Sequence, residues 1–142
     1  MQTSARNQFS GVVAQATAGA VNDEIIIDIT GSQQIVATVT HDSAARLGLK
    51  TGAKVVALVK ATSVIVMVDA DATKVSARNF VQGKVTNLTK GAVNADVTIT
   101  GDNGMAVAAI ITNASVDRLG LAVGKPAAAM FKASSVIVGV DN

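Results

Sequence analysis

The sequence contains no cysteine, tryptophan or tyrosine, and it has a single histidine, His41, and a single proline among 142 residues. Without cysteine the chain has no disulfide, no thiolate metal ligand and no thiol nucleophile. One histidine cannot build a histidine-rich metal site, nor a Ser-His-Asp triad in both halves of a duplicated chain. We therefore expect a protein that is not an enzyme, with no catalytic cofactor and no site for a bare metal cation.

Long apolar runs are lacking as well. Runs such as Val64–Val68 fall far below the roughly 20 residues that cross a membrane. The first ten residues, MQTSARNQFS, lack the apolar stretch of a secretion signal. These features predict a cytoplasmic protein with no membrane partner.

Aromatic and charged residues are scarce, at 2% and 15%, and the formal net charge is only +2. Hydrophobic residues make up 49%, which predicts a folded chain with a core of Val, Ile, Leu and Ala. A nucleic-acid-binding module would need aromatic platforms and a basic groove. We expect no nucleic-acid partner, although an OB-fold nucleic-acid binder is kept as an alternative.

The chain is a tandem repeat. SARN at Ser4–Asn7 recurs at Ser76–Asn79, an offset of 72 residues, and KATSVIV at Lys60–Val66 recurs as KASSVIV at Lys132–Val138. An RLGL segment and a GAVN tetrad recur at the same offset. The repeat predicts two modules, residues 1–69 and 76–142, joined by a polar linker over residues 70–75.

Each repeat is rich in short runs of Val, Ile and Thr punctuated by Gly or Asn, which predicts strands. In the first repeat they fall near Phe9–Ala16, Glu24–Thr30, Gln34–Thr40, Lys54–Val59 and Val64–Val68, with turns at Ala18–Asp23, Thr30–Gln33 and Ala61–Ser63. A short helix is expected between the third and fourth strands, capped by Asp42 or Ser43 and ended by Gly48. Its counterpart is capped by Ser115 or Asn113 and ended by Gly120. The predicted fold is all-β, two tandem OB-like five-stranded barrels.

Hydrogen-bond donors recur before the first and the last predicted strand of each repeat. In the first repeat they are Ser4, Arg6, Asn7, Lys60, Thr62 and Ser63. No acidic residue recurs beside them. Such a set suits a fully deprotonated oxyanion, because a hydrogen phosphate would also need an acceptor for its proton. The alternative is structural: a polar segment before a strand, and an ordinary turn.

SARN before an apolar strand, RLGL, and K-A-[ST]-S-V-I-V near the end of the unit together resemble the molybdate-binding Mop, or molbindin, family and the related TOBE domains. The resemblance covers both repeats and is similar to a tandem di-Mop arrangement. It implies a symmetric homo-oligomer, a trimer, that binds molybdate or tungstate at interfaces between modules and serves molybdenum storage or homeostasis. The alternative is a regulatory or transporter accessory domain acting in trans.

Carried over by position, the resemblance implies that Ser4–Arg6 hold one side of the anion and Lys60–Thr62 of a neighbouring module the other. Threonines at the end of the third strand would add hydroxyl donors. The oxyanion-binding residues are then Ser4, Ala5, Arg6, Asn7, Thr40, Lys60, Ala61, Thr62, Ser76, Ala77, Arg78, Asn79, Thr112, Lys132, Ala133 and Ser134.

The GAVN tetrads have two interpretations. They are either turns with Gly19 and Gly91 at positive φ, or a second oxyanion site built from backbone N–H groups. The second interpretation involves Gly19, Ala20, Val21, Asn22, Gly91, Ala92, Val93 and Asn94.

Three other features are assigned structural roles. His41 is expected to be solvated, because Asn113 replaces it in the second repeat. Asp23, Glu24 and Asp28 are expected to be routine exposed acids. The methionines in apolar runs are interpreted as core residues; they are Met67, Met105 and Met130.

Overall fold

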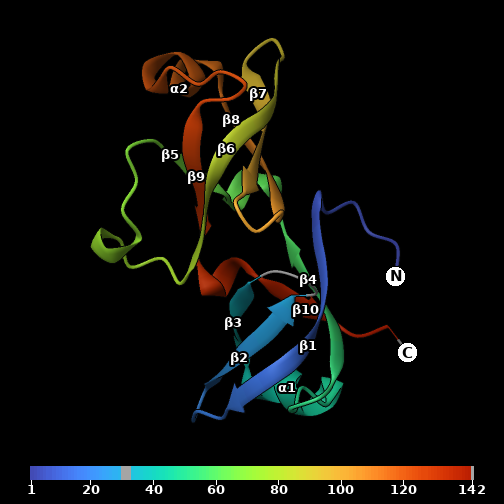
Figure 1. Ribbon diagram of the computed structural model, residues 1–142. Coiled ribbons are helices and arrows are strands. Elements are labelled where there is room, and N and C mark those ends of the chain that lie inside the picture. The colour runs from blue at the N-terminus through green and yellow to red at the C-terminus, as the bar shows by residue number, and fades with distance from the viewer. Residues whose placement is uncertain (30–32, 142) are drawn as a thin grey trace. The chain divides into compact units, whose positions relative to one another are not determined.

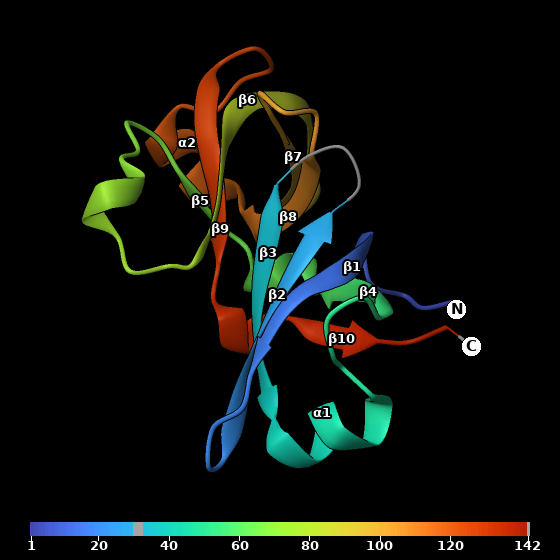
Figure 2. The ribbon, with the colours of Figure 1, turned by 60° about the horizontal axis from the view of Figure 1, so that its bottom comes forward.

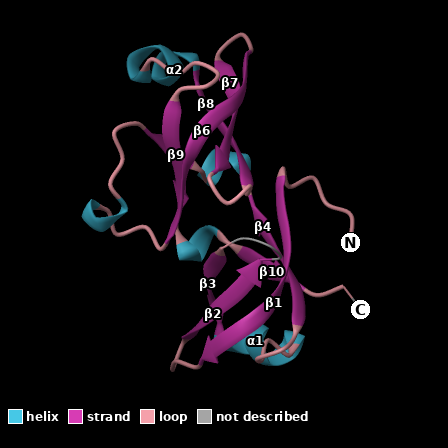
Figure 3. Cartoon of the chain, viewed as in Figure 1, coloured by secondary structure: helices cyan, strands magenta, loops and turns pink. Residues whose placement is uncertain are grey.

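A computed structural model describes residues 1–29 and 33–141 and divides the chain into two compact units (Figure 1). Each unit is a curled five-stranded antiparallel sheet with one short α-helix (Figure 3). No helix in the described part of the chain has the length and apolar character needed to cross a membrane.

Unit 1 comprises Met1–Val59 and Lys132–Asn142. Its hydrogen-bonded strand order is β10-β4-β1-β2-β3. The elements are β1 (Asn7–Thr17), β2 (Asn22–Ile29), β3 (Gln34–Thr40), α1 (His41–Leu47), β4 (Lys54–Val59), the 3₁₀ turn η3 (Ala133–Ser135) and β10 (Ile137–Gly139).

Unit 2 comprises Lys60–Phe131, with strand order β5-β9-β6-β7-β8. The elements are η1 (Ala61–Ser63), β5 (Ile65–Met67), η2 (Ala72–Lys74), β6 (Asn79–Lys90), β7 (Asn94–Gly101), β8 (Ala106–Thr112), α2 (Asn113–Leu119) and β9 (Pro126–Phe131). The predicted linker, residues 70–75, contains η2, which Asp71 caps.

The short fifth strands are exchanged between the sequence repeats. β5 belongs to the first repeat and pairs with β9 of the second, whereas β10 belongs to the second and pairs with β4 of the first. The compact units therefore differ from the predicted modules 1–69 and 76–142. Each unit still contains five strands and one α-helix, which lies between β3 and β4 in unit 1 and between β8 and β9 in unit 2.

Alternation of buried and exposed residues explains the strands. In β2, Ile25 and Ile27 are fully buried, and Ile35 of the adjacent β3 faces the same core. β1 and β6 each contain a register shift, between Val13 and Gln15 and between Val85 and Asn87, and such bulges bend a strand and increase its twist. The bend curls each sheet around a core of mostly aliphatic side chains, with Phe131 the largest of the fully buried ones.

Strand bounds follow the predictions closely, but the helix caps do not. Thr40 and Thr112 are the N-caps, each accepting a hydrogen bond from the backbone nitrogen of Ser43 or Ser115 at 3.1 Å. The predicted caps Asp42, Ser43, Asn113 and Ser115 were therefore wrong, because the threonine at the end of the preceding strand already has the extended backbone of an N-cap. Gly48 and Gly120 end the helices at positive φ, as predicted. The predicted turn Thr30–Gln33 lies mostly outside the described residues.

Candidate functional site

The SARN segment of the first repeat leads directly into β1. Ser4 and Arg6 are exposed, while Asn7 is buried with 2% of its surface accessible. Two residues outside the predicted site hold this segment: the Ala5 backbone nitrogen donates to Thr3 Oγ1 at 3.1 Å, and Gln8 Nε2 donates to the Ala5 carbonyl at 2.9 Å. Sequence comparison of the repeats could not find them, because Val75 and Phe80 stand at their positions in the second repeat.

The lysine segments form 3₁₀ turns. In η1 the Ser63 nitrogen donates to the Lys60 carbonyl at 2.9 Å, and in η3 the Ser135 nitrogen donates to the Lys132 carbonyl at 2.9 Å. The predicted turn Ala61–Ser63 is thus confirmed. Lys60, Thr62, Lys132 and Ser134 are exposed. The first N–H groups of such a turn point away from its own hydrogen bonds and are available to an anion.

Strand pairing brings the end of each arginine segment next to the start of the lysine segment of the same repeat. β1 and β4 pair so that Asn7 lies opposite Val59, and β6 and β9 pair so that Asn79 lies opposite Phe131. Arg6 precedes Asn7 and Lys60 follows Val59 in the chain. The arginine and lysine of one repeat therefore leave the sheet from the same pair of strand ends, and the same holds for Arg78 and Lys132.

Thr40 and Thr112 lie at the other end of the sheets. Thr40 pairs with Asn22 and Thr112 with Asn94, beside the GAVN turns. The 11 residues of β1 separate this end from Arg6, which at about 3.3 Å per residue is roughly 36 Å along the strand. Their hydroxyls are also engaged, donating to Ser43 Oγ and Ser115 Oγ. Within one unit, the structure does not bring these threonines to the SARN segment.

The GAVN tetrads connect β1 to β2 in unit 1 and β6 to β7 in unit 2. In unit 1 this turn lies at the same end of the sheet as α1 (Figure 2). Of the described glycines, those at positive φ are Gly48, Gly52, Gly104, Gly120 and Gly124, so the expected positive φ at Gly19 and Gly91 was wrong. A close approach explains Gly19 instead, because a Cβ there would lie 2.2 Å from the Asn22 carbonyl oxygen.

The N–H groups of both turn glycines already have partners. Gly19 donates to Asp23 Oδ1 at 3.1 Å, and Gly91 donates to the Asn94 carbonyl at 2.7 Å. The carbonyls of Val21 and Val93 accept from the first helical residue, while their side chains are 73% and 69% exposed. These bonds weaken the interpretation of the tetrads as a second oxyanion site.

His41 and Asp23 form a hydrogen-bonded pair, ionic when His41 is protonated, that the sequence did not predict. His41 Nδ1 lies 2.9 Å from Asp23 Oδ1, and only 8% of the Asp23 side chain is exposed. The bond to His41 and that from Gly19 lower the pKa of Asp23, and the bond to Asp23 raises the pKa of His41. The expectation of a solvated His41 is confirmed, since 51% of its side chain is exposed, whereas the expectation of a routine exposed Asp23 was wrong.

The second unit stabilises the same turn without this pair. Ala95 and Asn113 replace Asp23 and His41, and Asn113 Nδ2 donates to the Gly91 carbonyl at 2.9 Å. Lys90 Nζ donates to Asp117 on α2. A cavity of about 320 Å³ lies at this turn; its lining includes Lys90, Gly91 and Asn94.

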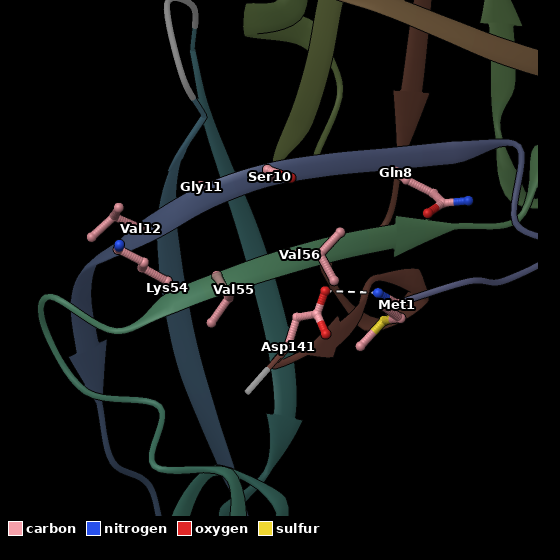
Figure 4. A pocket seen from close by; sticks show the side chains of 9 residues that line it. All are labelled: Met1, Gln8, Ser10, Gly11, Val12, Lys54, Val55, Val56 and Asp141. Carbon is pink, nitrogen blue, oxygen red and sulfur yellow. Dashed lines mark hydrogen bonds and ion pairs between the residues drawn. The ribbon is translucent and has the colours of Figure 1, made fainter.

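A larger cavity, of about 490 Å³, lies on the outer face of β1 and β4 (Figure 4). Gln8, Ser10 and Lys54 contribute polar groups, and the Met1 ammonium donates to Asp141 at 2.7 Å at one end. None of the predicted oxyanion-binding residues lines it. Across residues 1–29 and 33–141, no group of three or more His, Cys, Asp or Glu is arranged to hold a metal ion.

Comparison with known proteins assigns the class. The TOBE domain family matches residues 3–66 and again residues 75–138, and the chain belongs to this family. It is similar, with 43% identity, a TM-score of 0.93 and coverage of 99% of this chain and 100% of the other, to a crystal structure of the cytoplasmic molybdate-binding protein ModG with molybdate bound. The two-sheet fold and the resemblance to the Mop family are thereby confirmed.

Curated relatives extend the comparison. The molybdenum transport protein ModE of Herbaspirillum seropedicae is 42% identical over all of this chain and 53% of its own length. The molybdenum-pterin-binding protein MopA of Rhodobacter capsulatus is 40% identical over 99% of the chain and 53% of its own length. The chain thus spans about half the length of these relatives. Molybdenum-pterin-binding protein 2 of Clostridium pasteurianum, in contrast, matches 47% of the chain over 98% of its own length, at 39% identity.

Proposed function

We propose that this protein binds molybdate and tungstate as intact oxyanions, in the cytoplasm, for molybdenum storage or homeostasis, and that it is not an enzyme. The observation that carries the proposal is the similarity over the whole chain to a protein crystallised with molybdate bound. The exposed Arg and Lys segments supply the chemistry that such an anion needs: cationic donors and turn N–H groups without a recurring carboxylate.

The proposed contacts are Ser4, Arg6, Lys60 and Thr62 in the first repeat and Ser76, Arg78, Lys132 and Ser134 in the second, with N–H groups of Ala61, Ala77 and Ala133 nearby. The Ala5 N–H, which donates to Thr3 Oγ1 here, would have to exchange that bond for one to the anion. We propose that each site is completed between modules of a homo-oligomer, a trimer. Native mass spectrometry with and without molybdate tests this, because anions held between subunits should stabilise the assembly by mass action. A monomer that binds its full complement of anions would contradict it.

Equilibrium dialysis against molybdate, tungstate, sulfate and phosphate tests the choice of ligand. Molybdate and tungstate should bind, and phosphate should be rejected, because at neutral pH it carries a proton that needs an acceptor. Sulfate is the stronger competitor, since it is also a fully deprotonated tetrahedral dianion and only the size of the site can exclude it. Tight phosphate binding without molybdate uptake would contradict the proposal.

A second candidate is a regulatory or transport accessory role in trans. It is favoured by the similarity of the chain to about half of each ModE relative. Affinity capture with purified tagged protein distinguishes the two roles. An accessory domain should retain one partner chain only when molybdate is present, whereas a storage protein should retain none in either condition.

A further inference from the structure

The first residue of each long strand is a buried asparagine. Asn7 begins β1 with 2% of its surface exposed, and Asn79 begins β6 with 1%. Each directly follows an exposed arginine of a SARN segment. Burying a side-chain amide is unfavourable unless its polar atoms are hydrogen-bonded, and a strand end next to solvent offers little reason to bury one. A duplicated asparagine at this point therefore calls for a specific role.

The Asn7 side chain forms a hydrogen bond with the peptide group that links β4 to the lysine segment. Its Nδ2 donates to the Val59 carbonyl oxygen at 3.2 Å, in a buried position. That oxygen belongs to the same planar peptide group as the Lys60 nitrogen, so the bond orients the plane from which Lys60 continues. The backbone nitrogen of Asn7 in turn belongs to the peptide group of Arg6. One buried side chain thus ties the start of the lysine segment to the end of the arginine segment.

The strand register of the second unit places Asn79 in the position that Asn7 has in the first. Asn79 lies opposite Phe131, the residue before Lys132, as Asn7 lies opposite the residue before Lys60. Both asparagines are too deeply buried for their side chains to be good contacts for an anion in solvent. The sequence predicted that both asparagines contact the anion directly. Their burial instead favours an indirect role in binding.

We propose that Asn7 and Asn79 are positioning residues, which fix the direction in which the arginine segment and the lysine segment of each repeat leave the sheet, each toward a site completed by a neighbouring module, without contacting the anion. This inference rests on the proposed oxyanion-binding function. Molybdate is larger than sulfate but has the same charge and shape, so the spacing of fixed donors is the property that separates the two. Loss of the asparagine amide should therefore reduce molybdate affinity and also the preference for molybdate over sulfate.

The test is calorimetric titration of the full chain with molybdate and with sulfate. Asn7→Ala should weaken molybdate binding about tenfold at the sites of the first repeat, reduce the molybdate-to-sulfate ratio, and leave the sites of the second repeat unchanged. Asn79→Ala should show the reverse pattern. If Asn7→Ala does not fold, as judged by circular dichroism, Asn7→Ser carries the same test with a shorter donor.

Val13→Ala is the matched control, since Val13 is 1% exposed, lies on the same strand and lacks any polar group. It should lower stability and leave both affinities unchanged. Equal loss of molybdate affinity in Val13→Ala and Asn7→Ala would overturn the inference, because stability rather than position would then explain it. Wild-type affinities in Asn7→Ala would overturn it as well, with the proposed function intact. Wild-type protein that takes up no molybdate would instead overturn the proposed function.

Discussion

Arginine and lysine offer an oxyanion different geometries, and this chain places both in each repeat. Arg6 presents a planar fork of donors, whereas Lys60 is a compact point charge. Arg6→Lys keeps the net charge and removes the fork. We expect a tenfold to hundredfold loss of molybdate affinity, about 1.5–3 kcal/mol, at the sites that use the first repeat only. Isothermal titration should then become biphasic.

Arg46→Lys is the control for that substitution. Arg46 is exposed in the last turn of α1, where a positive charge interacts favourably with the helix dipole, and lysine serves that purpose equally well. Its molybdate isotherm should match the wild type. Loss of affinity in Arg46→Lys but not in Arg6→Lys would place the site at the opposite end of the sheet.

The ion pair between Asp23 and His41 makes the stability of unit 1 depend on pH. The raised pKa of His41 means that its contribution is complete below the unfolded value of about 6.5 and is lost as pH rises through the folded value. The lowered pKa of Asp23 means that its contribution is present above about 3.8 and is lost as pH falls through the folded value. The pair therefore stabilises most between these limits.

His41→Asn, which copies Asn113 of the second unit, should remove this dependence. Urea unfolding at pH 5 and pH 8 measures it: the wild type should gain more stability than the variant on going from pH 8 to pH 5. Identical pH profiles for the two proteins would show that the pair contributes nothing. The control is Asp42→Asn, which leaves the hydrogen bond between Asp23 and His41 intact and removes only the smaller effect of the Asp42 charge on the pKa of His41, so most of the pH dependence should remain.

At the level of the strands, the close pairing of β1 with β2 requires a residue without a side chain, Gly11, and the pairing of β6 with β7 requires Gly83. A Cβ on Gly11 would lie 2.3 Å from the Asp28 carbonyl oxygen, and one on Gly83 would lie 1.9 Å from that of Thr100. Backbone must move to admit either, so Gly11→Ala and Gly83→Ala should each cost at least about 1–3 kcal/mol in chemical denaturation. Ser10→Ala, exposed on the same strand as Gly11, should change stability by less than about 0.5 kcal/mol.

The helices provide a second test at this scale. Thr40→Ala removes the acceptor for the Ser43 nitrogen and should destabilise unit 1 by about 1 kcal/mol, while Thr40→Ser should restore most of it. Molybdate affinity should be unchanged in both variants if Thr40 acts only as a cap. A large loss of molybdate affinity without a change in the free energy of unfolding would instead show that Thr40 contacts the anion.

Local patterns explain which elements could be predicted. Period-two burial marks β2 and β4, and the lysine turns were located by their residues, because both depend on neighbours in sequence. The caps were missed because Asp, Ser and Thr all cap helices, and only the backbone conformation shows which of them stands at the boundary. The pair of Asp23 and His41 was missed because its partners lie on separate elements and do not recur in the second repeat.

At the scale of the whole molecule, the exchange of β5 and β10 could not be read from the sequence. Ile65–Val66 and Ile137–Val138 carry the same side chains in the same order, and each is exposed at the isoleucine and buried at the valine. Either strand would therefore bury the same surface against β4 or β9. The periodicity of a repeat specifies a fifth strand for each sheet and leaves open which copy supplies it.

The exchange of β5 and β10 predicts different association states for two fragments of the chain, residues 60–131 and residues 1–69. Residues 60–131 form a contiguous unit that contains all five strands of its sheet, so this fragment should fold as a monomer. Residues 1–69 end with β5, whose partner β9 is absent from the fragment, and they lack β10. Two copies of this fragment can complete each other's sheets by pairing β5 of one copy with β4 of the other, an exchange of identical elements.

Analytical ultracentrifugation should show a monomer for 60–131 and a dimer for 1–69. A monomeric, cooperatively unfolding 1–69 would mean that the repeat can close on its own fifth strand, and the exchange would then be a choice between nearly equal pairings rather than a requirement of the fold.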